Sequence, residues 1–368
     1  MAAAMALPGL FAAPAVRAQQ APPEQGLVSI KVLDYLDSQP GRDRIRVRAP
    51  ALSLLAPVAG NWAVGGTFVS DSISGASPAF HTQALGSVND LRRALDLTAT
   101  RYAALSSVGF GASYSKEADY VSRSVSLQLA LWGQDKNRTW TFGISTSNDR
   151  IDPSNRRVVG ETKRVADLLA GVTQVLSTHD IVQVNVGYSN GRGYFSDPYK
   201  IFDNRPRRHN RETFVARWNH HIEASGGTLR TSWRYHTDNY GVDAHTLGVE
   251  YVQPVGGGLR ITPLVRLYTQ RAADFYVDAD PTGSPFPPQP PRGATYFSED
   301  QRLSAFGAAT LGLKLAKQWD AGWLAGWQAD IKFERYAQRG AWRAFGTGSA
   351  GLAPFNARSV QLGLAHSF

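Results

Sequence analysis

Arginine side chains are the groups in this sequence whose type and spacing point most directly to chemistry. Together with one lysine, they recur on the polar side of segments in which polar and apolar residues alternate: Arg44, Arg46, Arg48, Arg217, Arg230, Arg234, Arg260, Arg266, Arg302 and Lys314. Guanidinium groups stay charged at every working pH and concentrate anions when they line a water-filled passage. If these side chains share one interior, they predict a preference for small anionic solutes.

Acidic side chains leave an alternative open. Fewer of them fall on the same polar side: Asp71, Asp96, Asp167, Glu250, Asp330 and Glu334. Arginines that pair with these acids across the interior would brace the structure and select no solute, because a neutralised guanidinium adds little to the local field. The charge pattern alone does not separate the two interpretations.

Two further charged segments suggest ligands. The basic run from Arg205 to Arg211 has the composition to bind phosphates of surface lipopolysaccharide, and a solvated loop that binds nothing is the alternative. No nucleic-acid-binding fold accompanies it, so we expect no nucleic-acid partner.

Asp274, Asp278 and Asp280 lack the glycine turn and terminal glutamate of a calcium loop, so we predict no metal site.

Histidines next to acids were the remaining candidates for catalysis. His236 precedes Asp238 and His245 follows Asp243, but His236 has polar parity whereas His245 has apolar parity. Side chains of opposite parity point to opposite faces of a strand, so they do not converge on one site. We also find no phosphate-binding glycine motif or dinucleotide fingerprint. We therefore predict neither a catalytic site nor a cofactor, and a surface enzyme is kept only as a third alternative.

The composition excludes several classes of protein. The chain has 368 residues, no cysteine, and 39 Lys and Arg against 30 Asp and Glu, a formal net charge of +9. Disulfide frameworks, thiolate zinc sites and thiol nucleophiles are excluded. No run of about 18 apolar residues occurs, so a helical membrane protein is excluded, whereas a membrane barrel is not.

The first 18 residues have the character of a secretory signal. An Ala- and Leu-rich segment leads to Ala15-Val16-Arg17-Ala18, although the usual positive n-region is missing. We expect cleavage after Ala18, so residues 1–18 are the signal peptide and residues 19–368 the mature domain. Export agrees with an oxidising envelope compartment.

Alternation with a period of two dominates the rest of the chain and predicts an all-β fold. One run extends from Leu303 to Leu315, which is long for a soluble protein and suits a strand that crosses a bilayer at a tilt. About sixteen strands are expected, near residues 27–37, 43–57, 62–74, 92–103, 106–117, 120–133, 138–149, 161–176, 180–193, 211–222, 227–237, 241–254, 258–276, 299–317, 320–338 and 356–368. Tight turns alternate with longer polar loops, which is typical of a transmembrane antiparallel β-barrel with short periplasmic turns and long extracellular loops.

Two segments do not follow the pattern simply. Residues 165–176 also fit helical spacing. In the second strand, Ile45 and Val47 have one parity while Leu52 and Leu54 have the other, and a bulge at Pro50 would reconcile them. With that bulge, Arg44, Arg46 and Arg48 would face the interior.

The last residues carry the most specific motif. Gln361, Gly363 and the terminal Phe368 end an amphipathic strand, and this arrangement resembles the signal read by the bacterial barrel-assembly machinery. His366 departs from the aromatic or aliphatic residue usual at its position. A closed barrel also removes the unpaired strand edges that would otherwise aggregate.

Four segments give the chain a family resemblance: DYLDSQPGRDR at residues 34–44, GRGYFSDPYK at 191–200, DNRPRR at 203–208 and YFSEDQRLSAFG at 296–307. With them, the chain resembles a family of uncharacterised Gram-negative outer-membrane proteins known as domain of unknown function 3570. The resemblance extends over nearly all of the mature chain and implies no catalytic residues. Genes of this family often lie near those for a thioredoxin-like protein and a flavin-attaching transferase, so the resemblance implies a periplasmic redox partner.

The sequence therefore predicts an outer-membrane β-barrel of Gram-negative bacteria. Its expected role is a passive channel for small anionic solutes, with outer-membrane lipid, lipopolysaccharide and the barrel-assembly machinery as partners. A structural or docking component of an envelope redox or flavin-linked system is the alternative.

Overall fold

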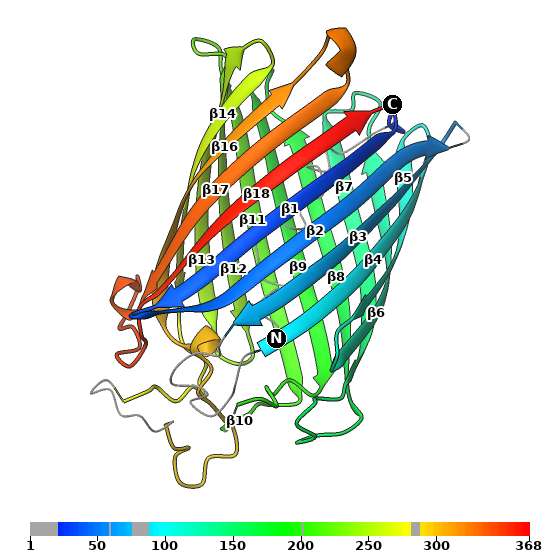
Figure 1. The fold of residues 1–368 in the computed structure, drawn as a ribbon. Coiled ribbons are helices and arrows are strands. Elements are labelled where there is room, and N and C mark those ends of the chain that lie inside the picture. Colours follow the sequence, from blue (N-terminus) through cyan, green and yellow to red (C-terminus); the bar gives the residue numbers. More distant parts are fainter. Residues whose placement is uncertain (1–20, 59, 76–87, 201, 281–287) are drawn as a thin grey trace.

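The computed structural model describes residues 21–58, 60–75, 88–200, 202–280 and 288–368. The predicted signal peptide, residues 1–18, lies outside this part of the chain. Within it, sixteen antiparallel strands close into one tilted barrel (Figure 1). In chain order they are β1 (Leu27–Gln39), β2 (Arg42–Val58), β3 (Trp62–Gly75), β4 (Val88–Tyr102), β5 (Ser106–Lys116), β6 (Tyr120–Trp132), β7 (Arg138–Ile151), β8 (Glu161–Val175), β9 (Asp180–Gly193), β11 (Arg208–Ile222), β12 (Gly227–Asp238), β13 (Asp243–Gly256), β14 (Leu259–Gln270), β16 (Phe306–Gln318), β17 (Trp327–Arg339) and β18 (Phe355–Ser367).

Each barrel strand pairs with its neighbours in the chain, and β18 returns to pair with β1. One end of the barrel, here called the turn end, carries the connections 59–61, 103–105, 133–137, 176–179, 223–226, 257–258 and 319–326. The opposite end, the loop end, carries the longest connections and is the lower end in Figure 1. The predicted transmembrane antiparallel barrel is thus confirmed. In the described part of the chain, no helix is long and apolar enough to cross a membrane.

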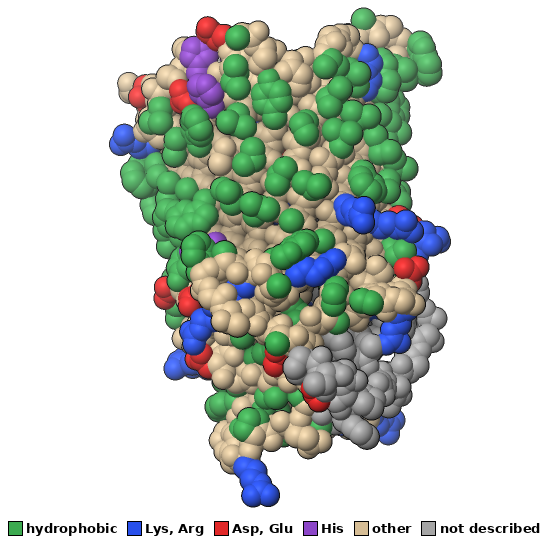
Figure 2. All heavy atoms as spheres, turned by 90° about the vertical axis from the view of Figure 1, so that its left-hand side faces the viewer, with side chains coloured by type: hydrophobic (Ala, Val, Ile, Leu, Met, Phe, Trp, Pro, Cys, Tyr) green, Lys and Arg blue, Asp and Glu red, His purple; other side chains and the backbone are tan. Residues whose placement is uncertain are grey.

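The two faces of the barrel wall differ as the alternation predicts. Large apolar side chains are exposed on the outside, among them Val125 (58%), Leu311 (60%) and Ile144 (53%). Figure 2 shows such side chains spread over much of the wall on one side of the barrel. Polar residues between them point inward. This distribution matches a lipid-facing exterior and a polar interior.

Three predicted strands are shorter than expected. Residues 271–276 and 299–305 belong to loop-end connections, and residues 320–326 belong to a turn that contains the 3-10 helix η3 (Gly322–Leu324). Within 299–305, Asp300 accepts a hydrogen bond from the backbone N–H of Arg302 and starts the 3-10 helix η2 (Gln301–Leu303). A local side-chain bond of this kind competes with the sheet ladder and stops it. Residues 165–175 form part of strand β8, so the helical alternative there is wrong.

The loop end contains a second, small sheet. Strand β10 (Asp203–Asn204) pairs with strand β15 (Phe297–Ser298) and so joins the connection after β9 to the connection after β14. A further 3-10 helix, η4 (Gly340–Trp342), follows β17. Small apolar clusters pack at this end, for example Tyr240, Val242 and Ala273. The loops are therefore organised by their own packing.

The barrel closes at its last residue. The backbone N–H of Gly26 donates to the carbonyl of Phe368 at 2.8 Å, and the N–H of Phe368 donates to the carbonyl of Gly26 at 3.0 Å. Gly363 leaves room for the Asp330 carboxylate, because a Cβ atom at this position would lie 2.7 Å from its Oδ1. His366 stacks on Trp327 with ring centroids 4.7 Å apart, which accounts for an aromatic heterocycle at that position.

Candidate functional site

Three of the predicted arginines gather on the inner wall of neighbouring strands. Arg217 of β11 lies opposite Ser232 of β12, whose neighbours on the same face are Arg230 and Arg234. Their faces are set by Trp218 and Trp233, which are exposed on the outside at 40% and 41%. Residues diagonal to one another across an antiparallel pair have Cβ atoms about 7 to 8 Å apart. Arg217, Arg230 and Arg234 thus form one cluster, here called the inner arginine patch.

The inner arginine patch is exposed to the interior and forms no ion pair within the described residues. Arg217 donates to Oε1 of Gln183 at 3.0 Å, a neutral partner. Glu250 lies opposite Arg230 in the β12–β13 register. Within the described residues, however, no ion pair involves Arg217, Arg230 or Arg234, and the pairs of the inner wall join other side chains, for example Lys163 with Asp149 and Lys314 with Asp330. The bracing alternative therefore does not apply to this patch.

A cavity of about 450 Å³ adjoins the patch toward the loop end. Arg234, Arg211 and His236 line it on one side, and Asp167 lies on the other. Arg211 donates to Oγ of Ser189 at 2.8 Å. This part of the interior thus combines guanidinium groups with hydroxyl and amide groups, which are the donors that an anionic or polyhydroxylated solute needs.

The remaining inward basic residues are mostly paired. Arg266 of β14 lies 3.9 Å from Glu334, Lys314 of β16 lies 3.5 Å from Asp330, and Lys332 lies 3.0 Å from Glu334. Asp71, another predicted acid, pairs with Arg92 at 2.7 Å. Arg260 has inward parity near the turn end. On the β14–β17 wall, therefore, the bracing interpretation holds for Arg266 and Lys314.

Strand β2 departs from the prediction. Its register with β1 runs without interruption from Leu27↔Leu55 to Leu36↔Arg46, so there is no bulge at Pro50. The irregularity lies instead between Leu36 and Ser38. Arg46 and Arg48 consequently share the outer face with Leu52 and Leu54. The prediction that they line the interior is wrong, because alternation across Pro50 continues unbroken.

The three arginines of β2 have separate partners. Arg46 lies 2.6 Å and Arg48 3.3 Å from the same Asp34 carboxylate on the outer face. Arg44 is buried, with its Nε 3.9 Å from Asp37, and its guanidinium lies 5.1 Å from the centre of the Phe355 ring. Arg44 is thus a buried structural residue that pairs with Asp37 beside the irregularity in the β1–β2 register.

The prediction that Arg302 faces the barrel interior from a strand is also wrong. It lies in η2 at the loop end, and its Nε donates to Oδ2 of Asp300 at 2.8 Å. Arg205 reaches the same Asp300 at 2.7 Å and Asp203 at 2.7 Å. These four residues form the loop ion cluster. Although burial alone would raise it, the positive charges of Arg302, Lys200 and Arg205 hold the pKa of Asp300 well below its usual range.

The loop ion cluster also changes the interpretation of the basic run at 205–211. Arg205 is committed to two carboxylates, and Arg207 pairs with Glu161 at 2.5 Å. Tyr240 donates to the carbonyl of Pro206 at 2.7 Å. Three of the four family-like segments, 191–200, 203–208 and 296–307, meet at this cluster. Their charged residues therefore connect loops, and Arg205 and Arg207 are not a free phosphate clamp.

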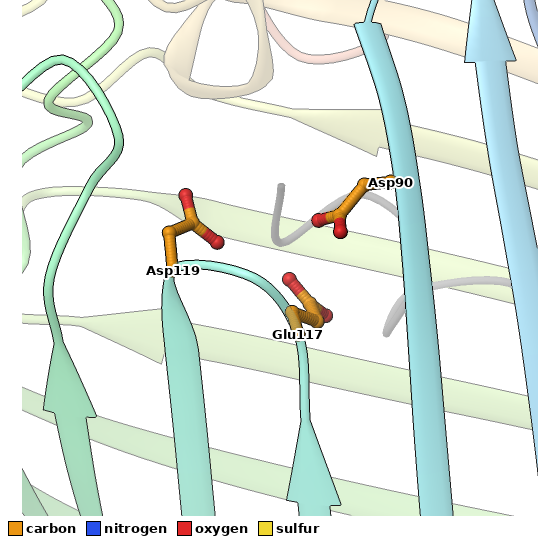
Figure 3. A group of neighbouring side chains, drawn as sticks. All are labelled: Asp90, Glu117 and Asp119. Carbon is orange, nitrogen blue, oxygen red and sulfur yellow. The ribbon is translucent and has the colours of Figure 1, made fainter.

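Three carboxylates that the sequence did not indicate come together at the loop end. Asp90 of β4, and Glu117 and Asp119 of the β5–β6 turn, point toward one another (Figure 3) and have ligand oxygens within 4.8 Å. Among the residues described, they are the group that has the geometry for a hard divalent cation, which prefers oxygen ligands. Asp119 accepts from the hydroxyl of Tyr199 at 2.6 Å. The Asp274–Asp280 segment forms no such group, since Asp274 pairs with Arg271 and Asp278 accepts from the N–H of Gly351.

Loss of the proton on Glu117 is expected to make the barrel less stable as the pH rises. Burial, and secondly the Asp90 carboxylate, raises the pKa of Glu117 to about 7. The folded state therefore holds this proton more tightly than the unfolded chain, and the stabilisation present below the unfolded pKa is lost as the pH rises through 7. We expect a loss of about 3 kcal/mol between pH 4 and pH 8. Urea unfolding of the protein in detergent, followed by tryptophan fluorescence, measures it. Glu117→Gln should flatten the profile, and an unchanged slope in this variant would contradict the assignment.

His236 and His245 lie on opposite faces of the wall. His236 lines the inner cavity, whereas His245 lies against Trp233 and Tyr235 on the outside. Asp238 accepts a 2.8 Å hydrogen bond from His209, and Asp243 accepts from the hydroxyl of Tyr235. The two histidines are therefore separated, as their parity predicts.

Solved structures share the barrel. CdiB from Acinetobacter baumannii matches 91% of this chain and 60% of its own at 10% identity and a TM-score of 0.50, so the chain spans about three-fifths of that protein. The siderophore receptor PirA from Pseudomonas aeruginosa matches 94% of this chain and 81% of its own at 9% identity and a TM-score of 0.48. The outer membrane protein opdK from Pseudomonas aeruginosa matches 93% of this chain and 99% of its own at 10% identity and a TM-score of 0.43. At these identities the likeness shows the fold alone.

Family membership rests on the sequence. No curated protein is significantly similar to the chain. The family described as "Protein of unknown function (DUF3570)" matches residues 83–359, which is most of the chain and includes the inner arginine patch and the loop ion cluster. The chain therefore belongs to the DUF3570 family.

Proposed function

We propose that this protein is a passive channel of the Gram-negative outer membrane that prefers small anionic solutes. The observation that carries the proposal is the inner arginine patch: three guanidinium groups on the inner wall of a sixteen-stranded barrel, none of which forms an ion pair among the described residues. Barrels of this strand number are wide enough to leave an aqueous passage. The turn end faces the periplasm in this proposal, and the loop end faces the outside.

Planar-bilayer recording of the purified protein tests whether the passage conducts. Stable conductance steps in a salt solution support a channel. A barrel that inserts but never conducts would contradict it. Insertion is verified separately by the slower gel migration that a folded barrel loses on heating.

Assembly is proposed to depend on the terminal residue. Deleting Phe368 removes two backbone hydrogen bonds to Gly26 that close the β1–β18 seam. We expect slower insertion and at least a severalfold lower level in the outer membrane, measured in pulse-labelled cells. Deletion of Pro288, which lies in the connection between β14 and β16, is the control. Equal levels of the two variants would mean that Phe368 is only a strand terminus.

A further inference from the structure

Three exposed arginines lie side by side on the outer face of the barrel. Arg164 of β8 is the direct Cα partner of Arg192 of β9, and Arg192 is the direct partner of Arg208 of β11. Directly opposite residues share a face. Val186 and Leu168, which have the same parity on β9 and β8, are exposed at 53% and 54% and mark this face as the outer one. We call these residues the outer arginine row.

The outer arginine row is an unfavourable arrangement by itself. Like charges placed directly opposite each other destabilise an antiparallel pair. Strands are about 4.8 Å apart, so three positive charges lie within about 10 Å across the wall. The nearest ion pairs in sequence are Lys163–Asp149 and Arg207–Glu161, and no acidic side chain in the described part of the chain pairs with the row itself. An external anion would remove the repulsion.

The outer arginine row lies between the loop end and the apolar part of the barrel wall. Toward the turn end, the next outward row contains Asn190 and Asn210, joined by a 2.8 Å hydrogen bond between their side chains. The row after that contains Leu168, Tyr188 and Glu212. Four residues of strand separate Arg192 from Tyr188, about 13 Å along the strand and about 10 Å along the barrel axis at the usual tilt. Because tyrosines mark the membrane interface, the arginines lie at the depth of lipid headgroups.

A second basic group on the opposite wall is partly neutralised. There, Arg46 and Arg48 share the Asp34 carboxylate. The outer arginine row has no such acid among the described residues, so a bound anion would reduce the repulsion between its charges more than it would at Arg46 and Arg48. Guanidinium groups bind phosphate oxygens through two parallel hydrogen bonds, and the side-chain amides below them can bond headgroup hydroxyls.

We propose that Arg164, Arg192 and Arg208 bind the phosphate of an anionic glycolipid in the outer leaflet of the membrane. This inference rests on the proposed outer-membrane location, but not on channel activity. It assigns lipid recognition to the wall between β8 and β11, to which the basic run at 205–211 contributes Arg208 while Arg205 and Arg207 pair with acids. The lipid, held at the depth of the row, neutralises it and fixes the loop end of these three strands.

Native mass spectrometry of the detergent-purified protein tests the proposal. The probe is purified diphosphoryl lipid A, compared with the same glycolipid after removal of its phosphates. We expect the triple Arg→Gln variant at 164, 192 and 208 to bind the phosphorylated probe at least tenfold more weakly than the native protein. The dephosphorylated probe should bind both proteins equally weakly. The matched control is the triple Arg→Gln variant at 217, 230 and 234, which loses the same charge inside the barrel and should bind like the native protein.

Three results would overturn the proposal: equal affinity of the native protein and the outer variant, equal binding of both probes to the native protein, or displacement of the lipid by millimolar inorganic phosphate, which would indicate a site for the free anion. Folding of each variant is checked by heat-dependent gel migration. The single variant Arg192→Gln, which removes the central guanidinium, gives the same test with a smaller expected loss if the triple variant does not fold.

Discussion

Replacing Arg217, Arg230 and Arg234 by glutamine is expected to lower the anion-to-cation permeability ratio of the reconstituted protein by about fivefold. A unit charge about 5 Å from a permeating anion in water contributes about 0.8 kcal/mol, which is a factor of about four. Arg217 lies diagonally about 7 to 8 Å from both Arg230 and Arg234, within the screening length of about 8 Å at physiological salt, so its field overlaps theirs, although Arg230 and Arg234 are about 13 Å apart along β12. Counter-charges on the β14–β17 wall are already paired with Lys314, Lys332 and Arg266.

The control for this variant removes the same charge from the outside. The triple Arg→Gln variant at 164, 192 and 208 should keep the native permeability ratio, because these side chains do not face the interior. Reversal potentials across a tenfold salt gradient measure both variants. An unchanged ratio in the inner variant would show that the inner arginine patch does not determine selectivity.

The second large effect is expected at the loop ion cluster. Asp300 is 1% exposed and holds both Arg205 and Arg302. Asp300→Asn leaves two guanidinium groups without their shared carboxylate, and breaking a buried pair in this way costs about 3 to 5 kcal/mol. The connection between β14 and β16 should then open far more often, and its proteolysis should become about a hundredfold faster.

The barrel itself should survive this change, since the cluster lies outside the barrel strands. Arg207→Gln is the control: its pair with Glu161 is largely exposed, and such pairs contribute less than about 1 kcal/mol. Because the pKa of Asp300 is depressed, the native loop should resist proteolysis at mildly acidic pH and become sensitive only when the pH falls through that low value. Equal cleavage rates for Asp300→Asn and Arg207→Gln would show that the cluster does not hold the loops.

The sequence predicted the barrel because alternation is a local property of each strand. It also placed Arg217, Arg230 and Arg234 correctly, since Trp218 and Trp233 beside them determine the outer face. Strand β2 shows the limit of this reasoning. The apolar residues of β2 change parity along the strand, and the sequence does not show where the strand is irregular. Only the pairing with β1 reveals that the irregularity lies between Leu36 and Ser38 and not at Pro50.

Other parts of the site depend on contacts between distant segments. Arg302 continues an alternating run, but the side chain of Asp300 bonds to the backbone and ends the strand there. Asp90 meets Glu117 and Asp119 only because β4 pairs with β5, so nothing in their spacing along the chain joins all three. The outer arginine row likewise requires the register of β8, β9 and β11. Parity shows which face of the wall an arginine occupies, but not that three exposed arginines lie directly opposite one another on neighbouring strands.

The most direct test of the account is the sign of the reversal potential of the native protein in a planar bilayer that separates two KCl solutions differing tenfold in concentration. With the inner arginine patch lining an open passage, chloride should carry most of the current, so the reversal potential should have the sign of an anion-selective pore at both pH 5 and pH 8. A reversal potential with the sign of potassium selectivity would contradict the proposed function.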